Sequence, residues 1–307
     1  MIRSLTHQGT TWVYVDRNDE EAVAYLATNF RFHHLDLEDV KGAALHPKLD
    51  VYKHYFFLVT LFPQTNGGVK VFGNELDMFV ESNTVLTVTN QPSPFLDKLF
   101  ERVSHSFKGK EELLSKGAGY LTYKILHNLY ADANAPIFDK IGHTLTELED
   151  KIFVRREQKI SNVIFQLAIL RRNVLELKRI IEPQKLVLQQ LVNMKVIFLD
   201  KEIADYFDDI LDLVNRYSVL LTNYKDIISG FYETHDSLAA HRTTAIIKML
   251  TAISVSFLPL TLIAGLYGMN VINLPLANRS WFAAALFSFV GIFLLGLFII
   301  LRKKKWL

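Results

Sequence analysis

Two long uncharged segments near the C-terminal end constrain this chain more than any other feature. Residues 249–266 and 281–301 contain no charged side chain and are largely apolar. A helix needs roughly 17–25 apolar residues to cross the hydrocarbon core of a bilayer, so each segment is long enough. The alternative is a pair of buried helices in a soluble core, where uncharged runs of this length are unusual. We therefore predict two transmembrane helices, 249–266 and 281–301.

The charges that flank these segments predict their orientation. Arg242 and Lys248 precede the first segment, a basic tail (302–307) follows the second, and the connecting loop (267–280) carries only Arg279. Positive charge stays on the cytosolic side of a membrane. We expect an outward-facing loop, two cytosolic termini and a location in the plasma (inner) membrane. The first residues lack the apolar core of a signal peptide, which agrees with a cytosolic N-terminal portion.

The N-terminal third mixes strand and helix patterns. Asn18 precedes three acidic residues and predicts a capped helix that ends near Asn29. Short β-branched and aromatic runs predict strands at 11–15, 55–62, 76–80 and 84–89. We expect an α/β cytosolic domain over 1–105. A helical cytosolic segment over 106–200 should follow, interrupted near Pro136 and Pro183.

A heptad pattern marks the region before the first apolar segment. Apolar residues recur at steps of four and three, broken only by His235, which predicts a helix with one packed seam. This stalk helix (201–248) should continue into the first membrane segment as one helix from Ile203 to Leu266, about 96 Å long. A helix of that length is a stalk packed against neighbours. The seam contains Ile203, Phe207, Ile210, Val214, Tyr217, Leu221, Tyr224, Ile228, Phe231, His235 and Leu238.

Composition excludes several classes of function. The chain has no cysteine, so disulfides, thiolate nucleophiles and cysteine-ligated zinc are absent. Its net charge is +2, too small to indicate nucleic-acid binding. No nucleophile lies beside a base at a recognisable spacing, so we expect neither an enzyme nor an organic cofactor.

One face of the first membrane helix is unusually small and hydroxylic. Steps of three and four place Thr251, Ser254, Leu258, Thr261 and Gly265 together. Small residues and hydroxyls also form tight helix–helix contacts in membranes, so a packing seam is one interpretation. The other is the lining of a polar pore.

The end of this helix carries the most specific motif. Tyr267-Gly268-Met269-Asn270 follows the run Leu258-Pro259-Leu260-Thr261-Leu262-Ile263-Ala264-Gly265 and ends the first of two C-terminal membrane segments. In this setting the chain closely resembles the CorA family of magnesium transporters. Weaker matches to that family are Leu35-x-x-Glu38-Asp39, Pro47-Lys48-Leu49-Asp50, Tyr55-Phe56-Phe57-Leu58-Val59, Lys248-Met249-Leu250-Thr251 and Lys303-Lys304-Lys305-Trp306-Leu307.

The resemblance implies a fold and a function. It implies a funnel-shaped homopentamer that moves divalent cations, with Mg²⁺ as the expected ion, down their electrochemical gradient. Mg²⁺ loses its water reluctantly, so rings of neutral oxygens suit the hydrated ion. By resemblance the selectivity filter is Tyr267, Gly268, Met269 and Asn270. The lower pore adds Thr244 and Ile247, where the family usually has asparagine and methionine.

The family is gated by intracellular divalent ions that bridge carboxylates of adjacent subunits. By position the candidates are Glu38 and Asp39 in the N-terminal domain, with Asp209 and Asp212 on the stalk. Carboxylates from two chains repel one another until an ion neutralises them, which would hold a closed state. The alternative is an ordinary solvated acidic patch, since acidic flanks are common on surface helices.

The outer loop departs from the family. Leu276 replaces the glutamate of the usual Met-Pro-Glu-Leu, and no acidic residue follows Asp236. Without an acidic ring the mouth does not concentrate cations. Two alternatives therefore stay open. One is transport of Zn²⁺, Co²⁺ or Ni²⁺, including proton-coupled transport as proposed for ZntB-like relatives. The other is a non-conducting, membrane-anchored coiled-coil sensor.

Overall fold

The computed structural model describes residues 2–16, 20–42, 46–65, 70–89, 91–153, 160–194, 202–269 and 280–303. The chain forms two compact units, Met1–Gly230 and Phe231–Leu307. One helix, α8 (Ile203–Tyr267), contributes residues to both units.

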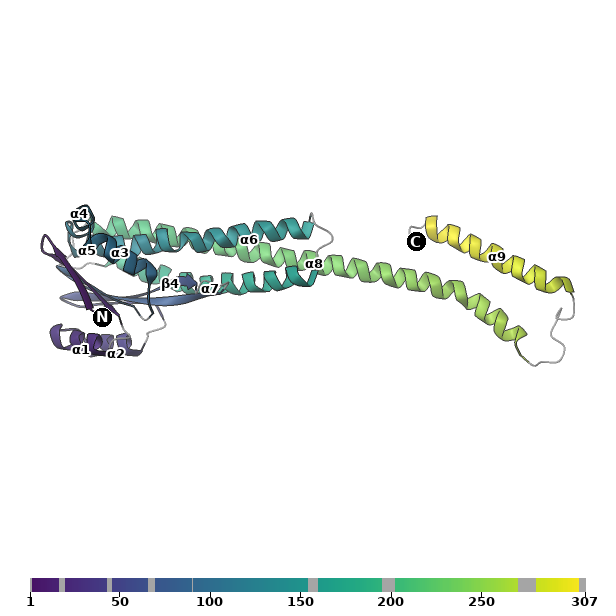
Figure 1. Cartoon of the computed structure of the whole chain (residues 1–307), viewed down its shortest axis with the longest axis horizontal. Helices are drawn as coiled ribbons and strands as arrows, with labels where there is room; N and C mark the ends of the chain where they lie inside the picture. Colours follow the sequence, from purple (N-terminus) through teal and green to yellow (C-terminus); the bar gives the residue numbers. More distant parts are fainter. Residues whose placement is uncertain are drawn as a thin grey trace. The chain divides into compact units, whose positions relative to one another are not determined.

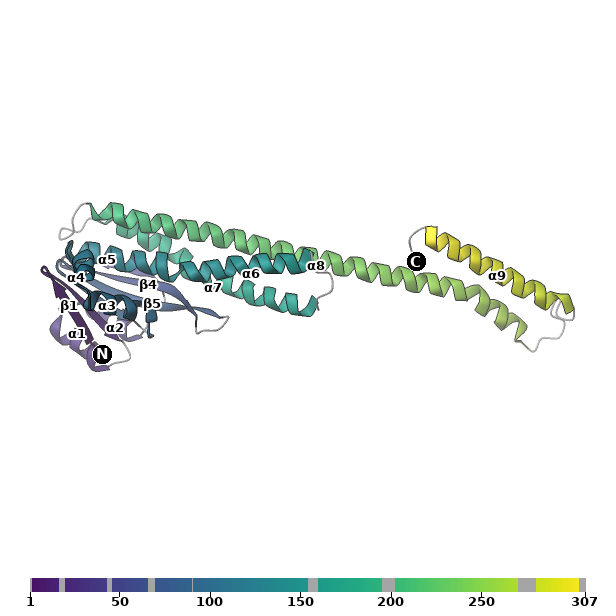
Figure 2. The same cartoon turned by 45° about the horizontal axis from the view of Figure 1, so that its top comes forward.

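A six-stranded mixed sheet organises the first unit (Figures 1 and 2). Its strand order is β1-β2-β6-β5-β4-β3. β2 and β6 pair in parallel, and the other neighbours are antiparallel. The strands are β1 (Ile2–His7), β2 (Thr10–Asp16), β3 (Lys48–Val51), β4 (Tyr55–Thr65), β5 (Val71–Glu81) and β6 (Thr84–Thr89).

Helices cover both faces of this sheet. Alternate side chains of a strand point to opposite faces, so the central strands supply two apolar layers. Helices α1 (Glu20–Asn29) and α2 (His34–Gly42) cover one face (Figure 1). The core there includes Val13, Val15, Leu26, Val40, Phe57 and Phe79. On the other face Trp12 is fully buried against Phe100 of α3 (Pro94–Ser104), and its indole N–H donates to the Thr87 hydroxyl over 3.0 Å.

Local capping starts the helices on that second face. The Ser93 hydroxyl accepts the Leu96 N–H at the start of α3, where Pro94 occupies the first turn. Ser106 caps α4 (Phe107–Leu114) in the same way. The chain continues through α5 (Gly117–Asn128), the π-helix η1 (Leu129–Ala133), α6 (Ala135–Phe153) and α7 (Ile160–Asn193).

The predicted break at Pro183 is wrong, because α7 runs through it without interruption. Proline removes one backbone hydrogen bond, but residues on both sides of it, among them Ile181 and Leu188, are buried and hold α7 against the sheet. Gln184 is 1% exposed, and its amide donates to the carbonyls of Ile180 and Leu61. Its oxygen accepts from the hydroxyls of Thr60 and Tyr130. This network fixes α7 to β4. The predicted interruption near Pro136 is present, since η1 ends just before α6.

The heptad seam of α8 packs inside its own chain. Phe207, Ile210, Val214, Leu221 and Ile228 are at most 1% exposed. Tyr217 stacks on Phe138 of α6 with ring centroids 4.1 Å apart, and its hydroxyl donates to the Tyr130 carbonyl over 3.0 Å. The neighbours of the seam over this stretch are therefore α6, α7 and η1 of the same chain.

Most of the other predicted strands and helices are present in the structure. The four predicted strands are β2, β4, β5 and β6, and the α/β fold class is confirmed. The single helix from Ile203 to Leu266 is confirmed as α8. The predicted helix near Asn29 is α1, while its cap at Asn18 lies outside the described residues. The boundaries near residues 105 and 200 stay predictions.

The second unit contains the last part of α8 and α9 (Ser280–Lys303). Among the described residues, α8 is the one helix with a stretch long and apolar enough to cross a membrane. Helix α9 carries a shorter apolar run, Ala284–Ile299. The predicted membrane segments 249–266 and 281–301 fall within these two helices.

Candidate ion pathway and regulatory carboxylates

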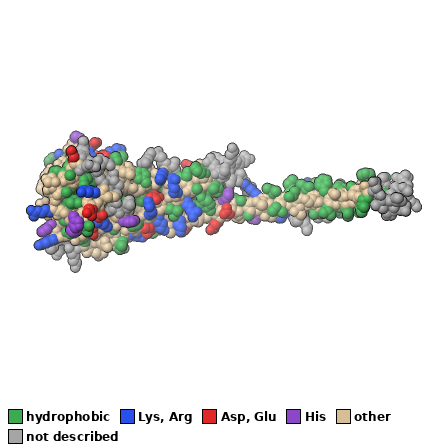
Figure 3. All heavy atoms as spheres, turned by 90° about the horizontal axis from the view of Figure 1, so that it is seen from below, with side chains coloured by type: hydrophobic (Ala, Val, Ile, Leu, Met, Phe, Trp, Pro, Cys, Tyr) green, Lys and Arg blue, Asp and Glu red, His purple; other side chains and the backbone are tan. Residues whose placement is uncertain are grey.

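The small, hydroxylic face of α8 is uncovered. Leu258 is 69% exposed, and the other predicted pore-lining positions are exposed as well. The space-filling view shows hydrophobic side chains along this part of the chain (Figure 3). Nothing in the described part of one chain packs on these positions, which are Thr244, Ile247, Thr251, Ser254, Leu258, Thr261 and Gly265.

A different face of the same helix is covered. Ala252 is 5% exposed, and Ser256, Pro259, Leu260 and Ile263 are half-buried. On α9 the half-buried positions Phe282, Leu286, Val290, Leu294 and Leu297 recur at steps of three and four. The rings of Tyr267 and Phe282 lie 5.2 Å apart. One face of α8 therefore packs against one face of α9, as in other pairs of packed helices. The hydroxylic face of α8 takes no part in that contact.

Pro259 and Thr261, near the end of α8, affect the hydrogen bonding of this helix. Pro259 lies inside the helix and cannot donate a backbone hydrogen bond. The Thr261 hydroxyl donates to the Phe257 carbonyl over 2.9 Å, which leaves the lone pairs of its oxygen available. The Thr261 hydroxyl oxygen therefore stays available as an acceptor on the exposed face of α8.

Gly268 directly follows α8, in a position where any side chain would meet the helix backbone. Its N–H donates to the Ala264 carbonyl over 2.9 Å. A Cβ atom at Gly268 would lie only 2.9 Å from that same carbonyl oxygen. The glycine of the motif is therefore required sterically. Tyr267 and Met269 are exposed beside it. Asn270 lies outside the described residues, as does the loop with Leu276.

The two N-terminal carboxylates differ in their surroundings. Lys48 Nζ lies 2.5 Å from Asp39 Oδ2 and 2.7 Å from Asp50 Oδ2. Burial acts to lower the pKa of Lys48, but its hydrogen bonds with Asp39 and Asp50 outweigh burial and raise it to about 12. Asp39 is thus already neutralised by an ammonium group. Glu38 is exposed and has no ion pair among the described residues.

A buried carboxyl supports this arrangement. Asp36 is fully buried and accepts hydrogen bonds from the hydroxyls of Tyr55 (2.8 Å) and Tyr52 (3.1 Å). Burial raises the pKa of Asp36, against the effect of these two hydrogen bonds. Lys48 lies 3.9 Å away. These groups tie α2 to β3 and hold Glu38 at the surface.

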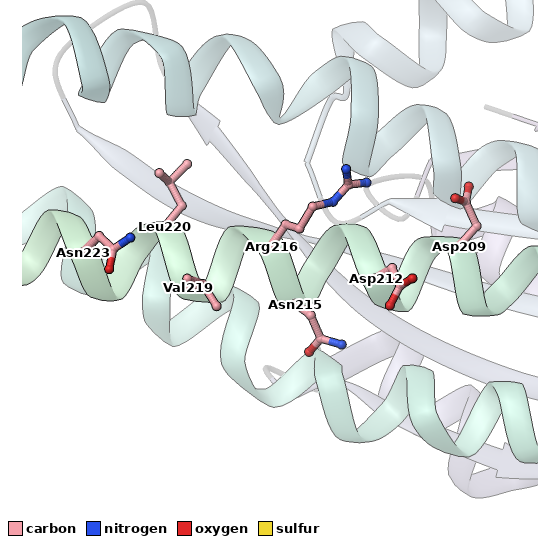
Figure 4. Close-up of a pocket in the computed structure, with 7 residues that line it drawn as sticks. All are labelled: Asp209, Asp212, Asn215, Arg216, Val219, Leu220 and Asn223. Atoms are coloured by element: carbon pink, nitrogen blue, oxygen red, sulfur yellow. The ribbon is translucent and has the colours of Figure 1, made fainter.

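The stalk carboxylates lie on an open groove along α8. This groove has a volume of about 680 Å³ and contains Asp209, Asp212, Asn215, Arg216, Val219, Leu220 and Asn223. Figure 4 shows that Asp209 and Asp212 point away from one another, with Arg216 on the side of Asp209. Within one chain, these two carboxylates therefore do not point towards a common ion position.

The structure does not bring the two carboxylate pairs together within one chain. Glu38 and Asp39 belong to α2, on one face of the sheet, while α8 packs with α6 and α7 on the other (Figure 1). Any ion that bridges Glu38 to Asp209 must therefore join two chains. Among the described residues, no group of three histidine or acidic side chains is placed to hold a metal ion.

A residue absent from the sequence prediction lies beside Asp209. His127 Nε2 is 3.7 Å from Asp209 Oδ2, and the Tyr123 hydroxyl is 3.5 Å from the same oxygen. Burial, and then the nearby Asp209 charge, raise the pKa of Tyr123. Tyr123 and His127 are one turn apart on α5. The pairing joins residues 82 positions apart, so no local spacing in the sequence signals it.

Comparisons with known proteins agree with this picture. A family model described as "CorA-like Mg2+ transporter protein" matches residues 7–303. The cobalt/magnesium transport protein CorA of Thermotoga maritima is 27% identical over 299 residues, which are 97% of this chain and 83% of the relative. The putative metal ion transporter YfjQ of Bacillus subtilis is 29% identical over 309 residues, 99% of this chain and 93% of the relative.

Solved structures also match. The complete structure of the CorA magnesium transporter from Methanocaldococcus jannaschii superposes with a TM-score of 0.85 at 19% identity, covering 99% of this chain and 94% of that one. The match extends over both units of the chain.

Proposed function

Because the chain belongs to the family of CorA-like Mg²⁺ transporter proteins, it transports divalent cations across a membrane, and we propose that Mg²⁺ is its principal ion. The ion moves down its electrochemical gradient through a pore built from several copies of α8. The relatives are named as transporters of magnesium, cobalt or metal ions. A non-conducting sensor is not favoured by this family membership.

The exposed hydroxylic face of α8 carries this proposal. Its residues are uncovered within one chain, although α9 covers the opposite side of the same helix. Such a face in the apolar part of a membrane needs polar neighbours or water. Further copies of α8 around an aqueous pore provide both. The family resemblance implies five copies, with both termini of each chain in the cytosol.

Asn270 and the Gly268 carbonyl are the proposed filter at the outer end of this pore. Both groups are neutral oxygen donors, which suit the water shell of Mg²⁺. Tyr267 and Met269 flank them in the motif. With Leu276 in the loop, the mouth attracts cations less than an acidic ring would, so we expect slow uptake at low external Mg²⁺.

Gating is proposed to use carboxylates from two chains. Glu38 is free of ion pairs in the described part of the chain, whereas Asp39 is held by Lys48, so Glu38 is the better partner for a stalk carboxylate. Asp209 and Asp212 face the groove on α8. An intracellular cation that joins Glu38 to the stalk of the next chain would stabilise a closed state.

The test is ion flux into liposomes that contain the purified full-length chain and a Mg²⁺-sensitive dye. We expect Mg²⁺ uptake by the wild type, with most of it lost in Asn270→Ala. The control is Asn193→Ala, which changes an exposed asparagine at the end of α7. Uptake by Asn270→Ala at the wild-type rate would overturn the filter. Zn²⁺ uptake that exceeds Mg²⁺ uptake and depends on a pH gradient would overturn the choice of ion.

A further inference from the structure

A concave apolar pocket lies in the first unit and shares no residue with the groove on α8. It has a volume of about 570 Å³ and is formed by α6, α7, the end of β4 and the start of β5. Helix α7 packs on both of these strands and on α6 (Figure 2). The apolar wall of the pocket consists of Val71, Ile137, Ile141, Phe165, Ile169 and Leu170.

Folding of the chain leaves apolar surface uncovered at this pocket. Val71, Ile141 and Leu170 are buried and form its base, whereas Phe165 is 65% exposed at its rim. The base is fixed by Asn173, which is 6% exposed and whose Oδ1 accepts the Val71 N–H over 3.4 Å. A ligand that covers the Phe165 ring removes apolar surface from water, and this favours binding.

The polar groups at the pocket favour an anion. Lys140 lines the pocket, is exposed and has no ion pair in the described part of the chain. The charge of the adjacent Asp139 acts on α8, where burial, and then this charge, raise the pKa of Tyr217. The Gln166 Oε1 accepts a hydrogen bond from Lys151 over 3.4 Å, which leaves the N–H groups of its amide as donors. No acidic side chain is among the described residues that line the pocket.

We propose that this pocket binds a fatty acid, with the alkyl chain against the apolar wall and the carboxylate at Lys140. Small-molecule sites are mostly apolar, contain a few polar groups and have volumes of about 300–1,000 Å³, and this pocket agrees with each of these properties. The head group is anionic because the one charged side chain among the described lining residues is an ammonium.

A second copy of the chain fits this pocket less well than an alkyl chain does. A stable protein contact covers about 800 Å² of each partner, whereas this pocket is a concavity between two helices and the ends of two strands. The site is separate from the ion pathway, so the inference does not rest on the proposed transport of Mg²⁺.

The test is calorimetric titration of the full-length protein in nanodiscs with octanoate. Octanamide is the uncharged counterpart, and empty nanodiscs give the blank. Lys140→Met should weaken octanoate binding by roughly threefold to fivefold, as expected for an exposed ion pair, and leave octanamide binding unchanged. Lys98→Met changes an exposed lysine on α3 as the matched control and should bind octanoate as the wild type does.

The alkyl chain is tested separately. Hexanoate has two fewer methylene groups and should bind roughly tenfold more weakly than octanoate. Ile169→Trp fills the pocket and should abolish binding of both octanoate and octanamide, whereas Leu175→Trp changes an exposed position on α7 and should not. Thr144→Phe provides a second way to fill the pocket. Thermal melting without ligand confirms that each variant is folded.

Several results would overturn the inference. One is an absence of octanoate binding to the wild type, and another is unchanged octanoate binding in both filled variants. Equal losses of octanoate and octanamide in Lys140→Met would show that the ammonium does not bind a carboxylate. In native mass spectrometry, an anionic phospholipid retained by the wild type and lost from Ile169→Trp would assign the pocket to membrane lipid. A smaller oligomer in Ile169→Trp than in Leu175→Trp would assign it to contact between copies.

Discussion

The same substitution at two nearby leucines should have opposite effects. Leu258 is 69% exposed on the hydroxylic face of α8, and Leu260 is half-buried on the side towards α9. Truncating a fully buried leucine to alanine costs about 2–5 kcal/mol. In proportion to burial, we expect Leu258→Ala to cost about 1 kcal/mol of stability and Leu260→Ala about 2 kcal/mol.

Their effects on conduction should be reversed. Leu258 is the bulky apolar residue among hydroxyls and glycine, so it forms a hydrophobic constriction in the proposed pore. Alanine removes three carbon atoms, and at about 0.8 kcal/mol for each the barrier to a hydrated ion falls by about 2.4 kcal/mol. That corresponds to roughly fiftyfold faster Mg²⁺ flux. Leu260→Ala leaves the constriction in place and should conduct at about the wild-type rate.

The assay pairs thermal melting in detergent with Mg²⁺ uptake into liposomes for the wild type and both variants. The reasoning is refuted if Leu258→Ala melts as early as Leu260→Ala while its flux stays at the wild-type rate. That outcome would make the hydroxylic face a packing seam, the alternative that the sequence left open.

Three further changes test other parts of the structure. Gly268→Ala should abolish Mg²⁺ flux without loss of folding, because its methyl group would meet the Ala264 carbonyl; Gly296→Ala, with open space around it, should conduct normally in the same assay. Gln184→Leu removes the acceptor that the Thr60 and Tyr130 hydroxyls share, so these hydroxyls can pair only with each other and one donor stays unsatisfied. The free energy of unfolding in urea titrations should fall by about 1–3 kcal/mol, against little change in exposed Gln190→Leu. The folded-state pKa of Lys48 is raised, so the stability it contributes is complete below about pH 10.5 and is lost as pH rises through about 12. The difference in unfolding free energy between the wild type and Lys48→Met should therefore shrink over that interval, and a constant difference would contradict the ion pair.

The sequence predicted the interior strands and the long helix because burial leaves a strong pattern in both. It did not reveal β1 or β3. β1 is an edge strand whose apolar and polar residues alternate weakly, and β3 has only four residues, two of them charged. Pro183 misled the helix prediction because tertiary contacts hold α7 together around it, among them the bond of the Gln184 amide to the Leu61 carbonyl of β4.

The candidate site, too, was predictable from the sequence only where its residues follow a local pattern. The spacing of three and four residues along α8 was enough to predict its hydroxylic face, because helical periodicity depends only on local sequence. Asp39 was selected by position alone, and only the structure reveals that Lys48 already holds it. His127 escaped notice because its partner is on another helix. Contacts between distant elements decide which carboxylates are free to bind an ion.

The π-helix η1 has a consequence for how chains of this kind diverge. A turn of π-helix accommodates one residue more than a turn of α-helix, so η1 (Leu129–Ala133) is a natural place for a one-residue insertion. Deleting one residue there would restore a regular α-helical turn and leave the faces of α6 unchanged, whereas a one-residue deletion inside α6 would rotate the part that follows by about 100°. Phe138 would therefore keep its stacking contact with Tyr217 after a deletion in η1. Length changes of one residue at this turn should be tolerated without coordinated substitutions on α6 and α8.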